Sequence, residues 1–406
     1  MTRLLINAGI LALLIWAGIN SGSAGLSRLF SEYSAASNSL VACDRALDYN
    51  SNDAEAHYIK AIHLSESEQL TDAIAELESA TRLRPEDYFL WQELGRLREE
   101  NGDSEGAIIA LEKATSLAPH YAQPHWQLGN ALLRNDRLTA AFKELRVAAA
   151  SDPDLFPSLM DLAFGIYEGE PIETAKAVDV RNDHERSFLF DFFLKHDCRD
   201  VAVGMLSSFT NLSNDDRKLI VSSLLNAEEF SLAYRFWLNG RALDNQLYDG
   251  DFESPIGADD KFGWQATRLT QTLKLVLDTD RPLQGNRSLR IDYAGNFEEH
   301  VPVLSQLIPV EANVRYQVSF DSRSENLFSA GLPVVVVNTI NDDNALGEST
   351  PLSSGTRALT STSFEFQTGD STKAIKLNLQ RSPCNVKPCP ITGKLWLDSF
   401  HLEKLK

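Results

Sequence analysis

The chain has 406 residues, of which 43% are hydrophobic, and a formal net charge of −19 at pH 7. This length allows two or three domains, and the apolar content is enough to bury a core, which excludes a disordered acidic chain. The strong negative charge and the lack of any Lys/Arg run argue against nucleic acid or an anionic membrane surface as the main partner.

An apolar run from Leu4 to Ile19 follows Arg3. It is short for a membrane span of about 20 residues, although Asn20 to Ala24 could extend it, and the small residues there also suit signal-peptide cleavage. We predict that residues 1–24 are a signal anchor or a cleaved signal peptide. The anchor is favoured because no A-x-A triplet follows. Either alternative exports the rest of the chain, as a single-pass inner-membrane protein facing the periplasm or cell exterior, or as a secreted protein.

The stretch 54–153 repeats itself three times with a period of 34 residues. Three columns of small and apolar residues recur at this spacing: Ala73, Ala107 and Ala141; Leu77, Leu111 and Leu145; Ala80, Ala114 and Ala148. Each unit ends at a proline (Pro85, Pro119 or Pro153), which cannot continue a helix. A 34-residue period is typical of helix–turn–helix repeats that stack into a solenoid.

The second unit resembles the tetratricopeptide repeat. It reads Trp91-x-x-Leu94-Gly95, then Ala107-x-x-x-Leu111, then Pro119. We expect two helices to cross closely at the glycine position, which Ala61, Gly95 and Gly129 occupy in the three units. The chain departs from the pattern at His57 and His125, which replace the aromatic residue, and at Lys60, which replaces Leu.

Helical patterns flank the clear repeats on both sides. Gly25 to Asp48 is predicted as one helix, the second helix of a partial leading repeat that caps the array, after a small-residue break from the apolar run. Residues 25–153 would thus form the tetratricopeptide region. Residues 154–242 keep helix-length apolar patterns and are interpreted as degenerate helical repeats, with the aromatic segment 188–194 in their core.

The character of the sequence changes at Leu243 to Leu247. Period-two apolar runs separated by turn residues follow, and no long helical pattern survives, which predicts an all-β sandwich over 246–406. The expected strands are Thr272–Asp278, Ser288–Tyr293, Val303–Val310, Tyr316–Ser322, Leu332–Thr339, Ser363–Gln367, Ala374–Gln380 and Lys394–Leu402. The predicted fold class is therefore multidomain, an N-terminal apolar helix, an α-solenoid and a C-terminal β-sandwich.

The order of motifs in 246–406 resembles carbohydrate-binding modules with a galactose-binding-like jelly roll. The motifs run from Asp249-Gly250-Asp251-Phe252-Glu253 and Phe262-Gly263-Trp264, through Gly285-x-x-Ser288-Leu289-Arg290-Ile291, to Gly393-Lys394-Leu395-Trp396-Leu397-Asp398. This resemblance identifies a fold better than a ligand.

The resemblance implies two kinds of site. Such modules often hold a structural calcium ion, for which the matching carboxylates are Glu253 and Asp398, with Asp251 as a further candidate; exposed turn carboxylates are the alternative. Sugar recognition needs aromatic faces that stack on pyranose rings. The candidates by type are Trp264, Tyr293, Phe297 and Phe328, although Trp264 and Trp396 occupy motif positions that more often fill the core.

Four cysteines fall into two classes. Cys384 and Cys389 lie in a proline-rich loop, and in an exported protein they predict a local disulfide; a metal site is the weaker alternative because no second Cys or His pair stands nearby. Cys43 and Cys198 lie in helical stretches and are expected to be small buried apolar residues.

No nucleophile elbow, phosphate-binding glycine loop or H-E-x-x-H motif is present, so we predict a protein that is not an enzyme and requires no cofactor. The structural calcium ion is a candidate and not a requirement. The favoured function is an exported, membrane-anchored bacterial adaptor. Its solenoid would bind a protein through first-helix residues such as Asn130 and Arg134, and its sandwich would bind a glycan in the assembly or export of an extracellular polysaccharide. The alternatives are a purely protein–protein scaffold and, third, a glycan-processing enzyme with an unrecognised site.

Overall fold

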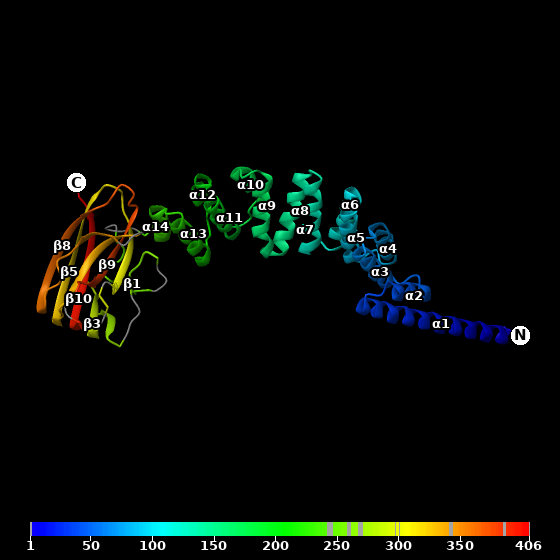
Figure 1. Ribbon diagram of the computed structural model, residues 1–406, viewed down its shortest axis with the longest axis horizontal. Coiled ribbons are helices and arrows are strands. Elements are labelled where there is room, and N and C mark those ends of the chain that lie inside the picture. Colours follow the sequence, from blue (N-terminus) through cyan, green and yellow to red (C-terminus); the bar gives the residue numbers. More distant parts are fainter. Residues whose placement is uncertain are drawn as a thin grey trace. The chain divides into compact units, whose positions relative to one another are not determined.

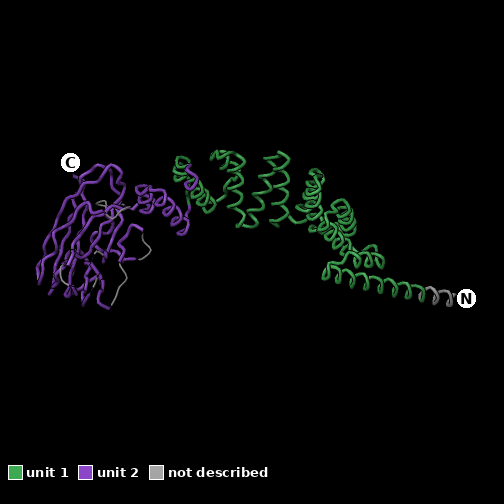
Figure 2. The backbone as a smooth tube through the Cα atoms, viewed as in Figure 1, with its two compact units in different colours: residues 1–193, 198–210 green, residues 194–197, 211–406 purple. Residues whose placement is uncertain are grey.

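The computed structural model describes residues 2–241, 247–257, 261–266, 271–296, 298–299, 301–340, 344–384 and 387–405, without the side chains of residues 2–10. The chain divides into two compact units, residues 1–193 with 198–210 and residues 194–197 with 211–406 (Figure 2). Most of the predicted change of character at Leu243 to Leu247 lies outside the described residues.

The first unit is a succession of helices joined by short turns (Figure 1). The helices are α1 (Thr2–Ser37), α2 (Leu40–Tyr49), α3 (Ala54–Glu66), α4 (Leu70–Leu83), α5 (Tyr88–Glu100), α6 (Ser104–Leu117), α7 (Ala122–Arg134), α8 (Leu138–Ser151), α9 (Phe156–Ile166), α10 (Pro171–Val178), α11 (Asp183–Lys195) and α12 (Arg199–Met205), with 3₁₀ turns η1 (Pro153–Leu155) and η2 (Leu206–Ser208). The helical solenoid that the repeats predict is confirmed.

The repeat columns form the contact between the two helices of each hairpin. Every residue of the Ala and Leu columns is at most 1% exposed. A Cβ atom added at Gly95 would lie 2.6 Å from Cγ of Leu111, and one at Gly129 would lie 2.6 Å from Cγ of Leu145. Only glycine therefore fits at these two crossings, because a real Cβ contact needs well over 3 Å.

The helix boundaries follow from local capping chemistry. The side chains of Asp53, Asp87 and Asp103 accept hydrogen bonds from the first backbone N–H groups of α3, α5 and α6. Helices α4, α6 and α8 each end two residues before the repeat proline, because the residue that precedes a proline disfavours the helical conformation.

The leading repeat differs from the prediction of one helix over Gly25 to Asp48. It is a complete hairpin, because α1 runs without a break from Thr2 to Ser37 and supplies the first helix, while α2 carries the matching Cys43 and Ala46. The chain turns at Asn38, whose φ of 52° is left-handed, and not at the small residues 20–25. Glycine in a helix costs only about 1 kcal/mol relative to Ala, so the small residues do not interrupt α1.

Helices α9 to α11 lack the repeat columns and pack through aromatic side chains instead. Phe190 and Phe193 of the aromatic segment are fully buried, which agrees with its predicted place in the core. Phe192 contacts Phe164 of α9 edge to face, at 5.4 Å between ring centroids. Among the residues described, no helix is both long enough and apolar enough to cross a membrane.

In the part of the second unit that the structure describes, helices precede two antiparallel sheets. The helices are α13 (Asn214–Asn226) and α14 (Phe230–Leu238); the strands are β1 (Gln265–Ala266), β2 (Leu273–Asp278), β3 (Ser288–Asn296), β4 (Leu304–Pro309), β5 (Arg315–Phe328), β6 (Pro333–Thr339), β7 (Ala345–Glu348), β8 (Gly355–Gln367), β9 (Ala374–Arg381) and β10 (Pro390–Lys404). The sheet orders are β1-β4-β9-β6-β7 and β2-β3-β10-β5-β8. Both sheets contribute to one apolar core, so the predicted β-rich C-terminal region is confirmed.

Aromatic contacts place α14 with the sheets. Trp237 meets Tyr248 at 4.7 Å between ring centroids, and Tyr234 meets Phe262 at 4.9 Å. The compact unit therefore begins before α13, upstream of the change in sequence character. The prediction missed β1, β7 and the first half of β8; the missed part of β8 is polar and mostly exposed, so it shows no alternation of apolar and polar residues.

Candidate functional site

The first helices of successive repeats present one connected surface in the first unit. We call it the first-helix face and define it by Tyr58 of α3, Phe89, Glu93, Arg96 and Glu99 of α5, and Asn130 and Arg134 of α7. Tyr58 and Phe89 meet edge to face across the unit boundary, with ring centroids 5.5 Å apart. Burial raises the pKa of the Tyr58 hydroxyl, and the nearby carboxylate of Glu93 raises it further.

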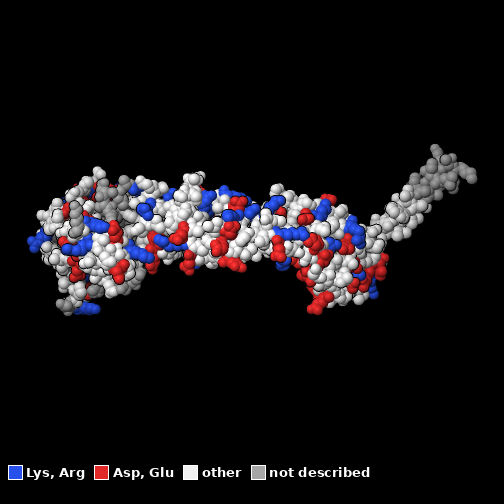
Figure 3. All heavy atoms as spheres, turned by 90° about the horizontal axis from the view of Figure 1, so that it is seen from above, with Lys and Arg blue, Asp and Glu red and all other residues white. Residues whose placement is uncertain are grey.

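Charged residues of both signs continue this face. Arg96 is held between the carboxylates of Glu93, at 3.0 Å, and Glu100, at 2.6 Å. Arg134 of α7 forms an ion pair with Glu99 of α5, which links two repeats. On the side of the molecule seen in Figure 3, Lys and Arg are likewise interspersed with Asp and Glu. A partner would thus meet mixed charge beside an aromatic pair.

The two residues predicted for the groove both lie on this face. The Arg134 side chain is 63% exposed, and its ion pair with Glu99 leaves part of the guanidinium open to solvent. Asn130 is half-buried, and its amide nitrogen donates to the carbonyl of Trp126 in its own helix at 2.9 Å. The prediction did not single out the aromatic pair Tyr58–Phe89, although both residues stand on predicted first helices.

Two hollows open in the first unit. The first, of about 680 Å³, is lined by Arg28 and Glu32 of α1, by Asp53 to Glu55 at the start of α3, and by Leu83 and Arg84. The second, of about 870 Å³, lies between the end of α8 and the starts of α9 and α11. Its walls are mostly apolar and include Pro153, Phe156, Pro157 and Phe188. Arg181 and Glu185, which also line it, form an ion pair at 2.6 Å.

Both repeat histidines have a carboxylate partner that the sequence analysis did not identify. His57 Nδ1 lies 2.5 Å from Glu76, and His125 Nδ1 lies 2.6 Å from Glu144. Each partner follows its histidine by 19 residues in the chain. The middle unit has Trp91 and Ala110 at these two positions. A histidine and a glutamate that replace these residues together are the pattern by which the pair could have been recognised in the sequence.

A buried polar cluster joins the leading repeat to the next one. Ser34 Oγ lies 3.1 Å from His63 Nε2 and 2.9 Å from Cys43 Sγ, and Glu66 stands 3.8 Å from the other ring nitrogen of His63. The residue types are those of a catalytic triad, but Ser34 and Cys43 are completely buried. A substrate cannot reach them, so this cluster is structural.

The sugar-stacking prediction is wrong for two of its four residues. Trp264 is 3% exposed, stacks on Phe252 at 5.2 Å, and donates its indole N–H to the Asp249 carbonyl. Tyr293 is 4% exposed, because its place on β3 points into the core. Phe328 is 56% exposed at the end of β5, and Phe297 lies outside the described residues.

The three predicted calcium ligands do not come together as one donor set. Glu253 accepts hydrogen bonds from the backbone of Asn286 and Arg287, which lower the pKa of its carboxyl. Buried Asp398 accepts from Ser288 and from the backbone N–H of Gln284. Among the described residues, these three carboxylates do not form a close group of potential metal ligands.

The two carboxylates instead hold the loop between β2 and β3. Both bind the last part of this loop, residues 279–287: Asp398 accepts a hydrogen bond from the backbone N–H of Gln284, and Glu253 accepts one from that of Asn286. Gly285, between these anchors, has a φ of +61°, and an added Cβ would lie 2.3 Å from the Glu253 carboxylate. Burial raises the pKa of nearby Asp249 to about 6, and the exposed carboxylate of Asp251 adds to the rise.

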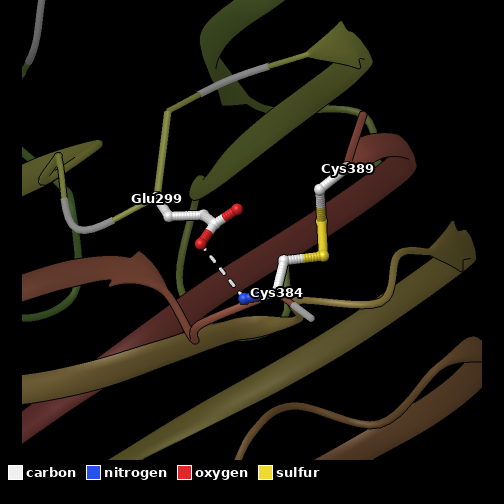
Figure 4. A group of neighbouring side chains, drawn as sticks. All are labelled: Glu299, Cys384 and Cys389. Atoms are coloured by element: carbon white, nitrogen blue, oxygen red, sulfur yellow. Dashed lines mark hydrogen bonds between the residues drawn. A yellow bond between two sulfur atoms is a disulfide. The ribbon is translucent and has the colours of Figure 1, made fainter. Parts of the chain in front are cut away.

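The structure joins Cys384 and Cys389 in a disulfide, and Glu299 accepts a hydrogen bond from the Cys384 backbone N–H at 3.1 Å (Figure 4). Glu299 and the two cysteines form the one close group of potential metal ligands among the described residues. Sulfur atoms bonded to each other are not thiolate ligands, so this group does not support a metal site.

The guanidinium of Arg381 is almost completely buried beside the disulfide. It donates to the Cys389 carbonyl at 3.0 Å and to Ser329 Oγ at 2.8 Å. Burial lowers the pKa of Arg381. The disulfide loop thus supplies acceptors to a buried cation.

A third hollow, of about 340 Å³, opens on the second unit between the loop 350–353 and strands β5 and β8. Hydroxyl groups dominate its walls, together with the guanidinium of Arg357: Ser322, Ser324, Thr350, Ser353, Thr360, Ser361, Thr362 and Ser363. No aromatic residue lines this hollow. It therefore offers hydrogen bonds without a stacking platform.

Comparison with known proteins identifies the repeats. The tetratricopeptide repeat family matches residues 93–155. No curated protein matches the chain. Among solved structures, MamA from Desulfovibrio magneticus RS-1 shares 20% identity over 38% of this chain and 90% of its own (TM-score 0.34). YrrB, a tetratricopeptide protein with an unusual peptide-binding site, shares 19% over 38% and 84% (TM-score 0.32).

A carbohydrate-binding module of family 4 shares 11% identity over 39% of this chain and 99% of its own, with a TM-score of 0.30. At such scores these structural similarities carry no argument about function. The family match and the buried repeat columns make residues 93–155 tetratricopeptide repeats. The chain thus contains a helical, tetratricopeptide-like solenoid region followed by a β-sheet-rich region.

Proposed function

We propose that this protein is a non-catalytic scaffold whose first-helix face binds a segment of another protein. Stacked helical repeats bury their cores between neighbours and leave a continuous face for a partner. The observation that carries the proposal is the contact between successive first helices through side chains that are exposed or partly exposed, by the ring pair Tyr58–Phe89 and the ion pair Arg134–Glu99. Aromatic and Arg side chains of this kind often dominate binding energies.

The partner segment is proposed to carry apolar and charged side chains together. An apolar side chain would cover the Tyr58–Phe89 pair, and a carboxylate could share Arg134 with Glu99. The second hollow, with Pro157 and Phe188 in its walls, would accept a further apolar group. Burying such groups contributes about 25 cal/mol for each Å² of apolar surface removed from water.

Substitution on the face tests this function. We expect Phe89→Ala and Arg134→Glu each to weaken binding of the cellular partner by about tenfold or more, a difference of at least 1.4 kcal/mol. Ser116→Ala is the matched control, because Ser116 is exposed on the second helix α6. Equal affinity of all three variants, measured by calorimetry with the partner, would refute the role of this face.

A second candidate function, glycan binding by the sandwich, is favoured by the hydroxyl-lined hollow. Its serine and threonine side chains can bond sugar hydroxyls, and Arg357 could hold an acidic sugar. Such binding would suit a role with an extracellular polysaccharide. Titration with acidic and neutral oligosaccharides, with and without calcium, should show binding that Arg357→Ala abolishes and Phe328→Ala spares. If the folded protein binds none of these oligosaccharides, glycan binding is refuted and the scaffold function is the one that remains.

We also propose that the chain is exported. The proposal is supported by the apolar run behind Arg3 and by the Cys384–Cys389 disulfide, a bond that persists in oxidising compartments. Thiol alkylation in intact cells should find this pair oxidised, and the mass of the mature chain will show whether residues 1–24 are cleaved. A reduced pair in growing cells would contradict export.

A further inference from the structure

A seam of apolar residues runs along one side of α1. Its members follow one another at alternating spacings of four and three residues: Ile15, Ile19, Gly22, Leu26, Leu29 and Tyr33. Apart from Gly22 they are large, and their exposed fractions range from 42% at Leu26 to 67% at Ile19. A mean spacing of about 3.5 residues is the pattern by which one helix packs along another.

Two seam residues occupy positions that face the preceding repeat elsewhere in the solenoid. One period after Leu26 and Leu29 stand Lys60 and His63. Lys60 pairs with Asp44 of the preceding hairpin at 2.9 Å, and His63 contacts Ser34 of the same hairpin. These two positions therefore point toward the unit that comes before.

In the second clear unit the same two positions are Leu94 and Leu97, which are 1% and 0% exposed. They pack in one cluster with Ala61, Ala73 and Leu77 of the preceding unit. Terminal repeats usually present a polar outer face. The leading hairpin, which was predicted to cap the array, keeps leucines on this outer face instead.

Three glycines of α1 have no packing role in the described chain. A Cβ added at Gly18, Gly22 or Gly25 would meet nothing within 4 Å. Each glycine costs the helix about 1 kcal/mol relative to Ala. Gly18 and Gly22 are four residues apart, the spacing that lets two helices approach closely. Their retention is explained if a second helix lies against α1.

A second copy of the chain is the occupant that fits this seam. Around Leu29 the apolar surface is only one helix wide, because Arg28 pairs with Glu32 at 3.2 Å and Ser31 is buried against the rest of the hairpin. At residues 11–19 the apolar surface runs all round α1, because Leu11, Leu13, Leu14 and Trp16 are exposed there as well. The single strip that a single partner helix would cover is therefore confined to residues 22–33. Identical seams are self-complementary, as an isologous interface requires.

We propose that two copies of this protein, each with residues 1–24 retained, pair through α1, in parallel and seam against seam, with their closest approach at Gly22. In this arrangement each of the seam residues meets its own counterpart in the second copy. The pairing uses no residue of the first-helix face. A result that refutes the dimer therefore does not refute the scaffold function, and a result that refutes the scaffold function does not refute the dimer.

Sedimentation of the full chain in mild detergent, with its mass confirmed, tests the pairing. We expect a dimer for the wild type and a dissociation constant weakened by about tenfold or more for Leu29→Glu and for Gly22→Leu. Leu29 is exposed and a Cβ at Gly22 meets nothing within 4 Å, so neither variant should alter the circular dichroism spectrum. Ala35 is exposed on the same helix but lines the first hollow, so Ala35→Glu should leave the dimer intact.

Cysteine crosslinking fixes the orientation. Leu29→Cys should form an intermolecular disulfide under mild oxidation, because parallel helices place the two copies of residue 29 side by side. A monomeric wild type, or a dimer that Leu29→Glu and Gly22→Leu leave unchanged, would overturn the proposal. A dimer without the crosslink would overturn its parallel arrangement.

Discussion

At the scale of single residues, the His57–Glu76 pair makes the stability of the first repeat depend on pH. The hydrogen bond to Glu76 raises the pKa of His57, and the same bond lowers the pKa of Glu76. The stability that His57 contributes to the fold is fully present below the ordinary histidine pKa of 6.5, and it is lost as the pH rises through the raised pKa of the folded state. The glutamate contribution is present above its ordinary pKa of 4.5 and is lost as pH falls.

The pair should therefore stabilise the fold most between about pH 4.5 and 6.5. We expect the double variant His57→Trp/Glu76→Ala, which copies Trp91 and Ala110 of the next unit, to fold and to reduce the pH dependence. Urea unfolding at pH 5.5 and pH 8.5 measures it. A wild type equally stable at both values, with the same response in the variant, would contradict this assignment.

A second prediction at this scale concerns the helix crossing at Gly95. Gly95→Ala should destabilise the protein by about 1–3 kcal/mol, because the new methyl group would overlap Leu111. Gly165→Ala is the matched control, since a Cβ there meets nothing, and it should be neutral or stabilising by less than about 1 kcal/mol. Thermal unfolding compares the two; similar losses in both would exclude the close crossing.

Single residues were also the hardest to place from the sequence. The Ala and Leu columns and Gly95 could be predicted as core because a 34-residue period repeats the same packing problem. Tyr293 could not be placed, since an aromatic residue in a strand such as β3 faces the core or solvent according to register alone. The motif position of Trp264 favoured the core, whereas its residue type suited sugar stacking. The carboxylates Glu253 and Asp398 could be named but not assigned a role, because their donors lie in distant segments.

At the scale of elements, the disulfide loop before β10 stabilises its surroundings by holding acceptors around Arg381. The double variant Cys384→Ser/Cys389→Ser should lower the free energy of unfolding by about 2 kcal/mol, the chain-entropy effect of so short a loop. Loss of the loop's carbonyl from Arg381 would add to this. Denaturant unfolding with and without a reductant gives the value, and an unchanged midpoint would show that the loop is held by other contacts.

Elements with a strong period could be predicted from sequence, and those without one could not. The repeat helices and strands such as β2 and β9 follow their apolar patterns closely. The leading hairpin was mistaken because glycines 22 and 25 resemble a break, whereas the helix crosses them and turns at Asn38. The edge strand β7 has four residues, too few for a period to be visible.

At the scale of the whole molecule, the chain contains a repeat array, for which we propose protein binding, and a β-rich unit, for which glycan binding is the second proposal. The array is built from units that share one packing scheme, while the exposed groups of its first helices differ from unit to unit. Partner choice would therefore reside in residues such as Phe89, Asn130 and Arg134, which can vary without cost to the core.

The most direct test of the scaffold function is site-specific photo-crosslinking in living cells. A crosslinking residue at Asn130 on the first-helix face is compared with one at Ser116 on α6. We predict one discrete adduct from position 130 that Phe89→Ala and Arg134→Glu suppress, and none from position 116. Adducts of equal yield at both positions, or an adduct at 116 alone, would contradict the central claim that this face receives the partner.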